Sequence, residues 1–383
     1  MGIYLDYNAT SPIDERVLEL MIGVYRNNYG NADSRTHDYG DNARKVVEGA
    51  RQKVADLLGI KKDEVFFTSG ATESNNIAIR GLMDYGIKNG KKHIVTSSIE
   101  HKAVLHSVKY LENEGFEVEY ISPDLSGRVS YEEIINKIRD DTLLVSIMHV
   151  NNETGVIQPV KEIGERLAES GTYFHIDATQ SCGKLVEEIR ELKYDMLSFS
   201  AHKLYGPQGI GTLVLKKRRY KLPPVKGIMF GGLQEQGIRP GTVPVALVAG
   251  MGEACRLAME EYIANMKKYV NIREIAFSLL GQSGLEYKIN GELKYIIPNT
   301  LNVSLTHVSS EALMLSAKQY CGISNGSACN SHEYATSFVL SAMGIQQNQI
   351  ENAIRISWGK DTNIDEFTRN FSELLTVARG LVF

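Results

Sequence analysis

The chain has 383 residues, of which 43% are hydrophobic, with a formal net charge of −4 and a pI near 6.2. This length is enough for a large core and a second, smaller domain, and the acidic balance argues against direct binding to nucleic acid. A signal peptide and an apolar run of membrane-spanning length are both absent from the sequence, so we expect a cytoplasmic protein without a membrane partner.

The first half of the chain alternates between helix and strand patterns. Apolar periodicity and start signals predict helices over 14–25 and 43–58, and then a strand over 64–68 that leads through a turn into a helix over 76–85. Further strands are predicted at 92–96, 118–121, 143–150, 174–177, 196–200 and 211–215, with helices at 102–114 and 131–138. This alternation predicts βαβ crossovers and a mostly parallel sheet.

The second half begins with a Lys-, Pro- and Gly-rich stretch over 218–241, which is long enough to be either functional or disordered. A long helix over 245–280 then leads to further elements at 296–303 and 311–320 and to a C-terminal helix after Asp365. We therefore expect a large domain over 14–257 and a small domain formed by 1–13 and 258–383.

The four cysteines are few and widely spaced, and no CxxC pair occurs, so neither a disulfide framework nor a zinc site is indicated. Cys182, Cys255 and Cys321 lie in apolar or helical contexts and are predicted to be structural. Cys329 instead lies among small polar residues, over 324–331, which favour a mobile loop and a reactive thiol.

The stretch 198–207 places Lys203 at the end of a predicted strand, over the crevice where open α/β sheets bind ligands. An isolated lysine in a turn is more often a solvated charge. Upstream, however, a second strand ends in Asp177, and Gln180 follows. A lysine for a Schiff base and an acid for a pyridinium nitrogen are what pyridoxal phosphate requires from a protein.

The turn between the strand 64–68 and the next helix offers free backbone N–H groups and a positive dipole end to a phosphate. Short turns of this kind are common. The alternative is an ordinary βα turn capped by Thr72.

The chain resembles the cysteine desulfurases, fold-type-I pyridoxal phosphate enzymes of the class-V aminotransferase family, in the branch with a long catalytic-cysteine loop. The resemblance covers essentially the whole length, and its matching stretches are 4–10, 68–74, 100–103, 149–155, 177–180, 200–203, 239–242 and 324–329. It implies an α/β fold-type-I transferase, with a mostly parallel sheet in the large, cofactor-binding domain and a smaller α/β domain that carries the cysteine loop.

The resemblance also implies a role for each candidate residue. Lys203 would form the Schiff base and act as a base, Asp177 would pair with the pyridine nitrogen, and Gln180 would bond the ring hydroxyl. His101 would stack on the ring and shuttle protons. The phosphate would be held by Ala71, Thr72, Ser200 and His202, and by Thr242 from a partner subunit, which makes the protein a homodimer.

For the substrate, the resemblance implies that Asn152 and Arg355 bind the α-carboxylate, with Asn8 and His37 near the site. Cys329 would accept the sulfur. Two departures from the family pattern stand out: Ala201 replaces a glycine, which is tolerated unless its φ is positive, and Leu233, Gln236 and Pro240 alter the glycine-rich loop.

We therefore predict a pyridoxal phosphate-dependent cysteine desulfurase that makes alanine and a persulfide, with no metal. A protein sulfur acceptor or an iron–sulfur scaffold would be its partner. Because Phe383 follows soon after the last predicted helix, we expect a dedicated pathway, such as DNA phosphorothioate modification, more than general iron–sulfur assembly. The alternatives are a selenocysteine lyase or another pyridoxal phosphate-dependent β-lyase, and a non-catalytic sulfur-transfer scaffold.

Overall fold

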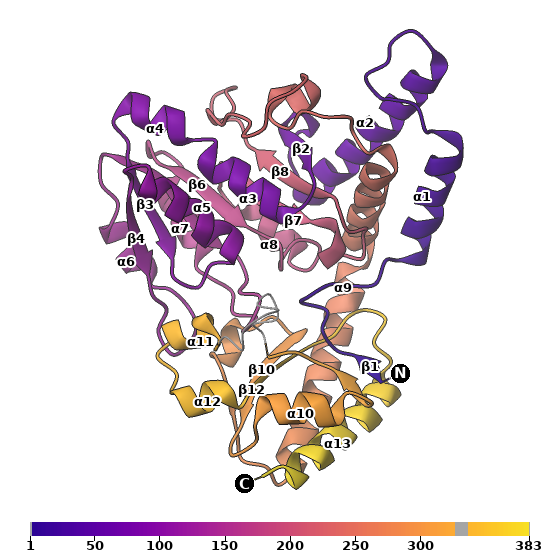
Figure 1. Ribbon diagram of the computed structural model, residues 1–383, viewed down its shortest axis with the longest axis vertical. Helices are drawn as coiled ribbons and strands as arrows, with labels where there is room; N and C mark the ends of the chain where they lie inside the picture. Colours follow the sequence, from indigo (N-terminus) through magenta and orange to yellow (C-terminus); the bar gives the residue numbers. More distant parts are fainter. Residues whose placement is uncertain (1, 326–335, 383) are drawn as a thin grey trace.

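The computed structural model describes residues 2–325 and 336–382, and its centre is a seven-stranded sheet (Figure 1). In spatial order the strands are β2 (Val65–Thr68), β8 (Gly211–Leu215), β7 (Met196–Ser200), β6 (Tyr173–Asp177), β5 (Thr142–Met148), β3 (His93–Ser97) and β4 (Glu117–Ile121). Only β8 runs against its neighbours; the pairs from β7 to β4 are parallel. The expected mostly parallel sheet is confirmed.

The central strands are buried along their whole length, as expected for strands that are covered on both faces. On one face, α3 (Ala71–Arg80) and α5 (Lys102–Asn113) contribute apolar side chains to a common core. The other face is covered by α2 (Asp38–Leu58), α6 (Tyr131–Asn136), α7 (Val160–Leu167), α8 (Val186–Glu191) and the start of α9 (Val245–Gln282). The remaining helices of this part are α1 (Glu15–Asn27) and α4 (Met83–Asn89).

The helix predicted over 76–85 was wrong at both ends. The helix α3 begins earlier, at Ala71, and ends at Arg80, just before Gly81. A separate helix, α4, then begins at Met83. A side chain at Gly81 would lie 2.6 Å from the carbonyl oxygen of Lys226, so the chain packs closely at this break. The helices α7 and α8, of eight and six residues, were not predicted.

The lower part of the molecule in Figure 1 has a core of its own, with a three-stranded antiparallel sheet in the order β12 (Ala353–Ser357), β10 (Thr300–Leu305) and β9 (Tyr287–Ile289). The N-terminal strand β1 (Ile3–Tyr4) pairs here with β11 (Cys321–Gly322). The helices of this part are α10 (Ser310–Ala317), α11 (Phe338–Ala342), α12 (Gln347–Glu351) and α13 (Ile364–Gly380).

The 38-residue helix α9 joins the two cores. Its buried residues up to Leu257 belong to the core of the seven-stranded sheet, and those from Tyr269 onward belong to the core of the smaller part. The division into domains that we expect near residue 257 would fall within this helix. In the part of the chain that the structure describes, neither α9 nor any other helix combines the length and apolarity that crossing a membrane requires.

The irregular stretch 218–241 is anchored by a charge pair. The short 3-10 helix η3 (Gln234–Gly237) contains Glu235 and Gln236 in left-handed conformations, with φ of 47° and 56°. The Arg51 guanidinium donates to the Glu235 carboxylate at 2.7 and 2.8 Å, and the backbone N–H of Phe67 donates to it at 2.8 Å. These contacts offset the strain of two non-glycine residues with positive φ.

Candidate active site

A cavity of about 700 Å³ opens where the parallel strands end. Its walls come from the segments that follow β2, β5, β6 and β7, from His101 after β3, and from two segments of the smaller part, Asn8–Thr10 and Arg355 on β12. Because the carboxyl ends of parallel strands share one edge of a sheet, chain segments far apart in sequence meet there. The cavity therefore lies between the two cores.

Lys203 ends the 3-10 helix η2 (Ala201–Lys203), which directly follows β7. Its Nζ donates to the carbonyl oxygens of Asn8 and Ala9, each at 2.5 Å. Ala201 is not among the described residues with positive φ, and its methyl group is buried in the core, so alanine is accommodated at the position where the resemblance implies glycine. Lys203 is among the residues that line the cavity.

Asp177 lies at the base of the cavity, and its carboxylate is held from two sides. The Asn75 amide donates to Oδ2 at 2.7 Å, and the backbone N–H of Thr179 donates to Oδ1 at 3.0 Å. A carboxylate can accept more than two hydrogen bonds, so Asp177 keeps capacity to bond a protonated ring nitrogen. Asn75 was not predicted as a site residue, although it directly follows one of the stretches that carry the resemblance.

Buried, hydrogen-bonded polar residues lie beneath Asp177 at the base of the cavity. His175 contacts Ser146 Oγ through Nδ1 at 2.8 Å and Ser198 Oγ through Nε2 at 2.9 Å. Burial lowers the pKa of His175 to about 4, so the imidazole is neutral near pH 7. Glu100 Oε1 accepts from Ser97 Oγ at 2.6 Å and from the Met148 N–H at 2.9 Å, and burial raises the pKa of Glu100 to about 8.

The N-terminus of α3 faces the cavity through Ala71, Thr72 and Glu73. The first intrahelical bond runs from Ser74 N–H to Gly70 O at 3.1 Å, so the preceding N–H groups lie at the helix end that attracts anions. Gly70 is the N-cap and no side chain caps it, so the alternative of a turn capped by Thr72 was wrong.

Ser200 and His202 line the same cavity as this helix end. Ser200 Oγ donates to the Ile210 carbonyl oxygen at 3.3 Å, and His202 Nδ1 lies 3.1 Å from Thr10 Oγ1. Burial, with a smaller contribution from Lys203, lowers the pKa of His202 to about 4. A hydroxyl and a neutral imidazole are therefore present for a phosphate group.

Gln180 is held by a partly buried lysine that sequence reasoning missed. Gln180 Nε2 donates to the Asn8 carbonyl oxygen at 2.9 Å, while Lys184 Nζ donates to the Gln180 carbonyl oxygen at 2.9 Å and contacts its Oε1 at 3.4 Å. Burial, together with the charge of Lys203, lowers the pKa of Lys184 to about 7. Lys184 follows Gln180 by four residues, on the next turn, and this spacing was the signal in the sequence that could have indicated the contact.

His101 is the N-cap of α5, where its Nδ1 accepts from the Ala103 N–H at 3.1 Å, and it lines the cavity. This bond fixes the ring orientation. It also leaves Nε2 as the nitrogen that carries the proton in the neutral form.

Arg355 is almost fully buried and lines the cavity. One terminal nitrogen donates to Asp6 Oδ1 at 2.6 Å and the other to the Asn152 carbonyl oxygen at 2.9 Å, while Nε has no partner in the described structure. Asn8 Nδ2 donates to the same Asn152 oxygen at 3.3 Å. Asp6 thus occupies one side of a guanidinium that the resemblance assigns to a carboxylate substrate.

Two of the predicted residues that the structure describes do not line the cavity. Thr242 is exposed, and His37 is exposed and caps α2 by accepting from the Gly40 N–H at 3.2 Å. Cys329 lies outside the described residues. The other cysteines, Cys182, Cys255 and Cys321, are buried and form no disulfide, and burial raises the pKa of each thiol, to about 12 for Cys321.

These residues fit pyridoxal phosphate. The cavity is wide enough for the cofactor, it has a lysine on one wall and a bonded carboxylate at its base, and it meets a helix N-terminus with a hydroxyl and an imidazole nearby. Glu73 also lines the cavity, and its negative charge is countered by Arg239, whose Nε lies 3.1 Å away.

Comparisons with known proteins agree with this geometry. The family model of class-V aminotransferases matches residues 3–368. The cysteine desulfurase IscS of Escherichia coli O139:H28 is 44% identical over 96% of this chain and 90% of its own length. Among solved structures, a NifS-like protein superposes with a TM-score of 0.90 at 37% identity, covering both chains completely. SspA in complex with cysteine has a TM-score of 0.81 at 34% identity, over 93% of this chain and 98% of its own.

The predicted fold class is confirmed by this likeness to the NifS-like protein. A lysine, a carboxylate and a helix N-terminus converge on one cavity, and the match extends over nearly the whole chain. On this basis the chain belongs to the cysteine desulfurases, pyridoxal phosphate-dependent members of the class-V aminotransferase family.

Proposed function

We propose that this chain converts L-cysteine to L-alanine and retains the sulfur as a persulfide on Cys329. The observation that carries the proposal is the convergence of Lys203, Asp177 and His101 on one cavity with the free N-terminus of α3. When bound, pyridoxal phosphate supplies the electron sink that weakens bonds at the substrate's Cα. The large part of the molecule, over 14–257, would be the cofactor-binding domain.

The protein side chains then bind, orient and move protons. The Asp177 carboxylate keeps the ring nitrogen protonated, and Asn75 keeps that carboxylate in place at 2.7 Å. Lys203 removes the proton from the substrate's Cα, and His101 lines the same cavity, where it can exchange protons. Arg355 and Asn152 bind the α-carboxylate, which takes over the Arg355 nitrogen that now donates to Asp6.

The sulfur step balances without an external oxidant or reductant. The Cys329 thiolate attacks the substrate sulfur, the bond between that sulfur and Cβ breaks, and its electron pair stays with the carbon skeleton, which takes up a proton and becomes alanine. The approach of Cys329 is supported by Ser324, whose backbone pairs with that of Arg355 through bonds of 2.6 and 3.3 Å. Cys329 follows Asn325 by four residues, a reach of up to roughly 14 Å.

A second copy of the chain would complete each site. Thr242 lies at the end of the anchored stretch 218–241, exposed and outside its own cavity, where it is available to a partner subunit's phosphate site. His37 would lie near the same boundary, because Gln234 Nε2 from that stretch donates to Asp33 at 2.8 Å, four residues before His37. We therefore propose a homodimer.

The sulfur acceptor is proposed to be a protein of a dedicated pathway, with an iron–sulfur partner in DNA phosphorothioate modification as the leading candidate and general iron–sulfur assembly as the alternative. Support comes from the altered glycine-rich loop, in which Leu233 is strongly exposed, because partner choice depends on such surface residues. A persulfide-transfer assay that compares a housekeeping scaffold with proteins encoded beside this chain tests this. Transfer to the scaffold alone would contradict the dedicated pathway.

The test of the desulfurase proposal uses Cys329→Ser with Cys182→Ala as the matched control. Cysteine should still change the visible spectrum of Cys329→Ser, but no protein persulfide should accumulate. Cys182→Ala should show both the spectral change with cysteine and the protein persulfide. Persulfide mapped by mass spectrometry to Cys182, Cys255 or Cys321 would overturn the assignment of Cys329.

Product analysis separates the alternatives. A β-lyase would release pyruvate, and a selenocysteine lyase would prefer selenocysteine and form no stable persulfide from cysteine. A non-catalytic scaffold that does not bind the cofactor would be colourless. Alanine and a protein-bound persulfide in equal amounts are expected only of the desulfurase.

A further inference from the structure

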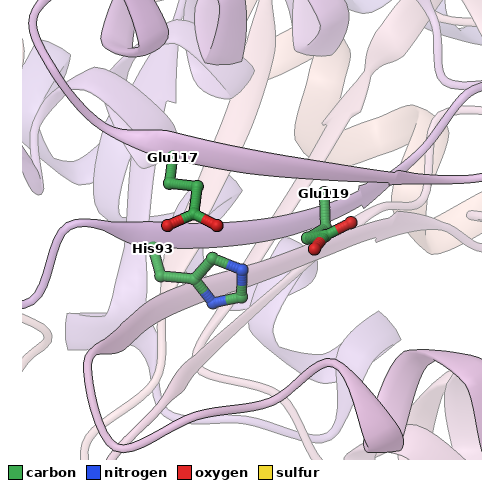
Figure 2. A group of neighbouring side chains, drawn as sticks. All are labelled: His93, Glu117 and Glu119. Atoms are coloured by element: carbon green, nitrogen blue, oxygen red, sulfur yellow. The ribbon is translucent and has the colours of Figure 1, made fainter.

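A second cluster of chemically competent side chains lies at the outer edge of the seven-stranded sheet (Figure 2). It consists of His93 on β3 and of Glu117 and Glu119 on the edge strand β4, and their ligand atoms all lie within 4.8 Å of one another. Among the described residues, this is the group whose side chains could hold a metal ion. The active-site cavity opens at the opposite, carboxyl ends of the strands.

The sheet register places the three side chains together. His93 is paired with Glu117 across the parallel strands, and Val95 is paired with Glu119. Because successive residues of a strand point to opposite faces, Glu117 and Glu119 share one face with His93. Figure 2 shows the imidazole and the two carboxylates gathered on that face. The arrangement is therefore a consequence of regular strand geometry.

The imidazole itself points to a ligand. His93 is completely buried, its Nδ1 lies 2.8 Å from Thr142 Oγ1, and its Nε2 is buried without any hydrogen-bond partner in the described structure. Figure 2 shows the ring extending towards the two glutamates. A buried ring nitrogen without a partner is uncommon, because burying an unsatisfied polar atom costs about 1–3 kcal/mol.

Thr142 Oγ1, which also accepts from the Arg139 backbone N–H at 2.8 Å, bonds Nδ1 of the ring, and outer partners of this kind orient metal-binding histidines. In the tautomer that donates Nδ1–H to Thr142 Oγ1, the lone pair is on Nε2, on the side of the carboxylates.

The two carboxylates already have cationic partners. Arg139 donates to both oxygens of Glu117 at 2.8 Å, and Lys137 Nζ lies 3.2 Å from Glu119 Oε1. All of these side chains are substantially exposed, and exposed ion pairs contribute only about 0–1 kcal/mol. A carboxylate oxygen also retains a second lone pair. Arg139 can therefore remain bonded to Glu117 while that carboxylate binds a metal.

We propose that His93, Glu117 and Glu119 form a binding site for a divalent first-row transition ion, with Zn²⁺ as the ion that suits one imidazole and two carboxylates. Water would occupy the remaining position. Ligands about 2.1 Å from a tetrahedral ion lie roughly 3.4 Å apart, so the exposed glutamate side chains must close by about 1 Å. The bound ion would tie the edge strand β4 to β3.

The experiment titrates the purified holoenzyme of the Cys329→Ser variant with Zn²⁺ by calorimetry, since this background removes the reactive thiol that would also bind zinc. One equivalent per chain is expected. Glu119→Gln should weaken the affinity by about tenfold or more, because a neutral amide replaces a charged ligand. The matched control is Glu191→Gln, which removes a carboxylate from another exposed pair, with Lys161 at 2.7 Å. It should leave the affinity unchanged.

A crystal of the same protein soaked in Zn²⁺ locates the ion. An anomalous peak about 2.1 Å from His93 Nε2 is expected, and it should be lost in Glu119→Gln. Glu119 is partly exposed, so this variant should fold normally, and the test does not depend on changing the buried His93. Absence of stoichiometric binding, equal affinity in Glu119→Gln, or a peak elsewhere on the surface would each overturn the proposal. Desulfurase activity, measured for Glu119→Gln in the chain that keeps Cys329, is a separate readout that should not change.

Discussion

The base and the rim of the active-site cavity differ in how completely one chain builds them. At the base, Asp177, His175 and Glu100 are buried, and each is hydrogen-bonded by neighbouring side chains or backbone. At the rim, Thr72 is exposed, and Arg355 has one nitrogen without a partner. The base residues are held in place by hydrogen bonds within one chain, although Glu100 Oε2 and Asn75 Oδ1 lack a partner among the described residues. The rim instead presents groups that substrate, phosphate or a second subunit would satisfy.

This difference follows from the proposed function of each region: the base positions the cofactor ring, and the rim binds ligands. A ring nitrogen stays protonated only if its carboxylate partner is held still, and a buried network with few alternatives provides that rigidity. Groups that receive a ligand must exchange their partners, so they are left partly unbonded. Four substitutions test whether base and rim separate in this way.

The largest effect is expected from Lys203→Ala, because this residue belongs to both regions. Loss of the reacting amine should lower alanine formation by about 1,000-fold or more. Lys161→Ala is the control, since that lysine lies in an exposed pair with Glu191 and should leave the rate unchanged. Near-normal activity of Lys203→Ala, with a borohydride-reducible linkage at another lysine, would contradict the assignment.

A rim residue should affect substrate affinity more than turnover. Arg355→Lys keeps the charge but loses the planar pair of donors, so KM for L-cysteine should rise about 10- to 100-fold with a smaller change in kcat. Steady-state kinetics measures this. Asp6→Asn removes the carboxylate that now competes for Arg355 and should lower KM or leave it unchanged. A large fall in kcat at constant KM for Arg355→Lys would place this residue in the chemistry instead.

A smaller effect is expected from Thr242→Val, which removes one hydroxyl from the proposed phosphate site. Cofactor retention should weaken by about 1–3 kcal/mol if that hydrogen bond is charge-assisted, as measured by release of the cofactor during dialysis. Mixed dimers with Lys203→Ala would have one intact site if Thr242 acts across the interface. No recovery of activity after demonstrated subunit exchange would place Thr242 in its own subunit's site.

The smallest effect on turnover is expected from Glu100→Gln, in the base. Its pKa of about 8 lies above the unfolded value near 4.3, so its stabilising contribution is full below about pH 4 and is lost as the pH rises through 8. The glutamine retains the oxygen that accepts from Ser97 and Met148, without the ionisation. Between pH 5 and 8, wild type should therefore lose on the order of 3 kcal/mol more unfolding free energy than the variant, measured by urea denaturation. Parallel pH profiles would contradict this.

The sequence indicated the residues proposed to react more readily than the partners that hold them in place. Lys203 and Asp177 each follow an apolar strand, and strand ends are visible in a single sequence because the hydrophobic run stops there. Asn75, Lys184 and Asp6 were missed as partners, since a pairing between residues as far apart as Asn75 and Asp177 has no local pattern. The break at Gly81 and short helices such as α7 were missed for a similar reason, because contacts with distant segments determine where such helices begin and end. At Gly81 the distant contact is with Lys226.

The sequence by itself determined the alternating strands and the mostly parallel sheet, and it singled out Lys203 as the candidate reacting lysine, because periodicity and residue chemistry are properties of the chain. Only the tertiary structure decided which side chains share a hydrogen bond, which nitrogens of Arg355 and His93 lack one, and that Glu117 and Glu119 face an unpartnered imidazole across two strands. The physical reason is that burial and contact depend on how distant segments pack, and register between strands is set by the whole sheet.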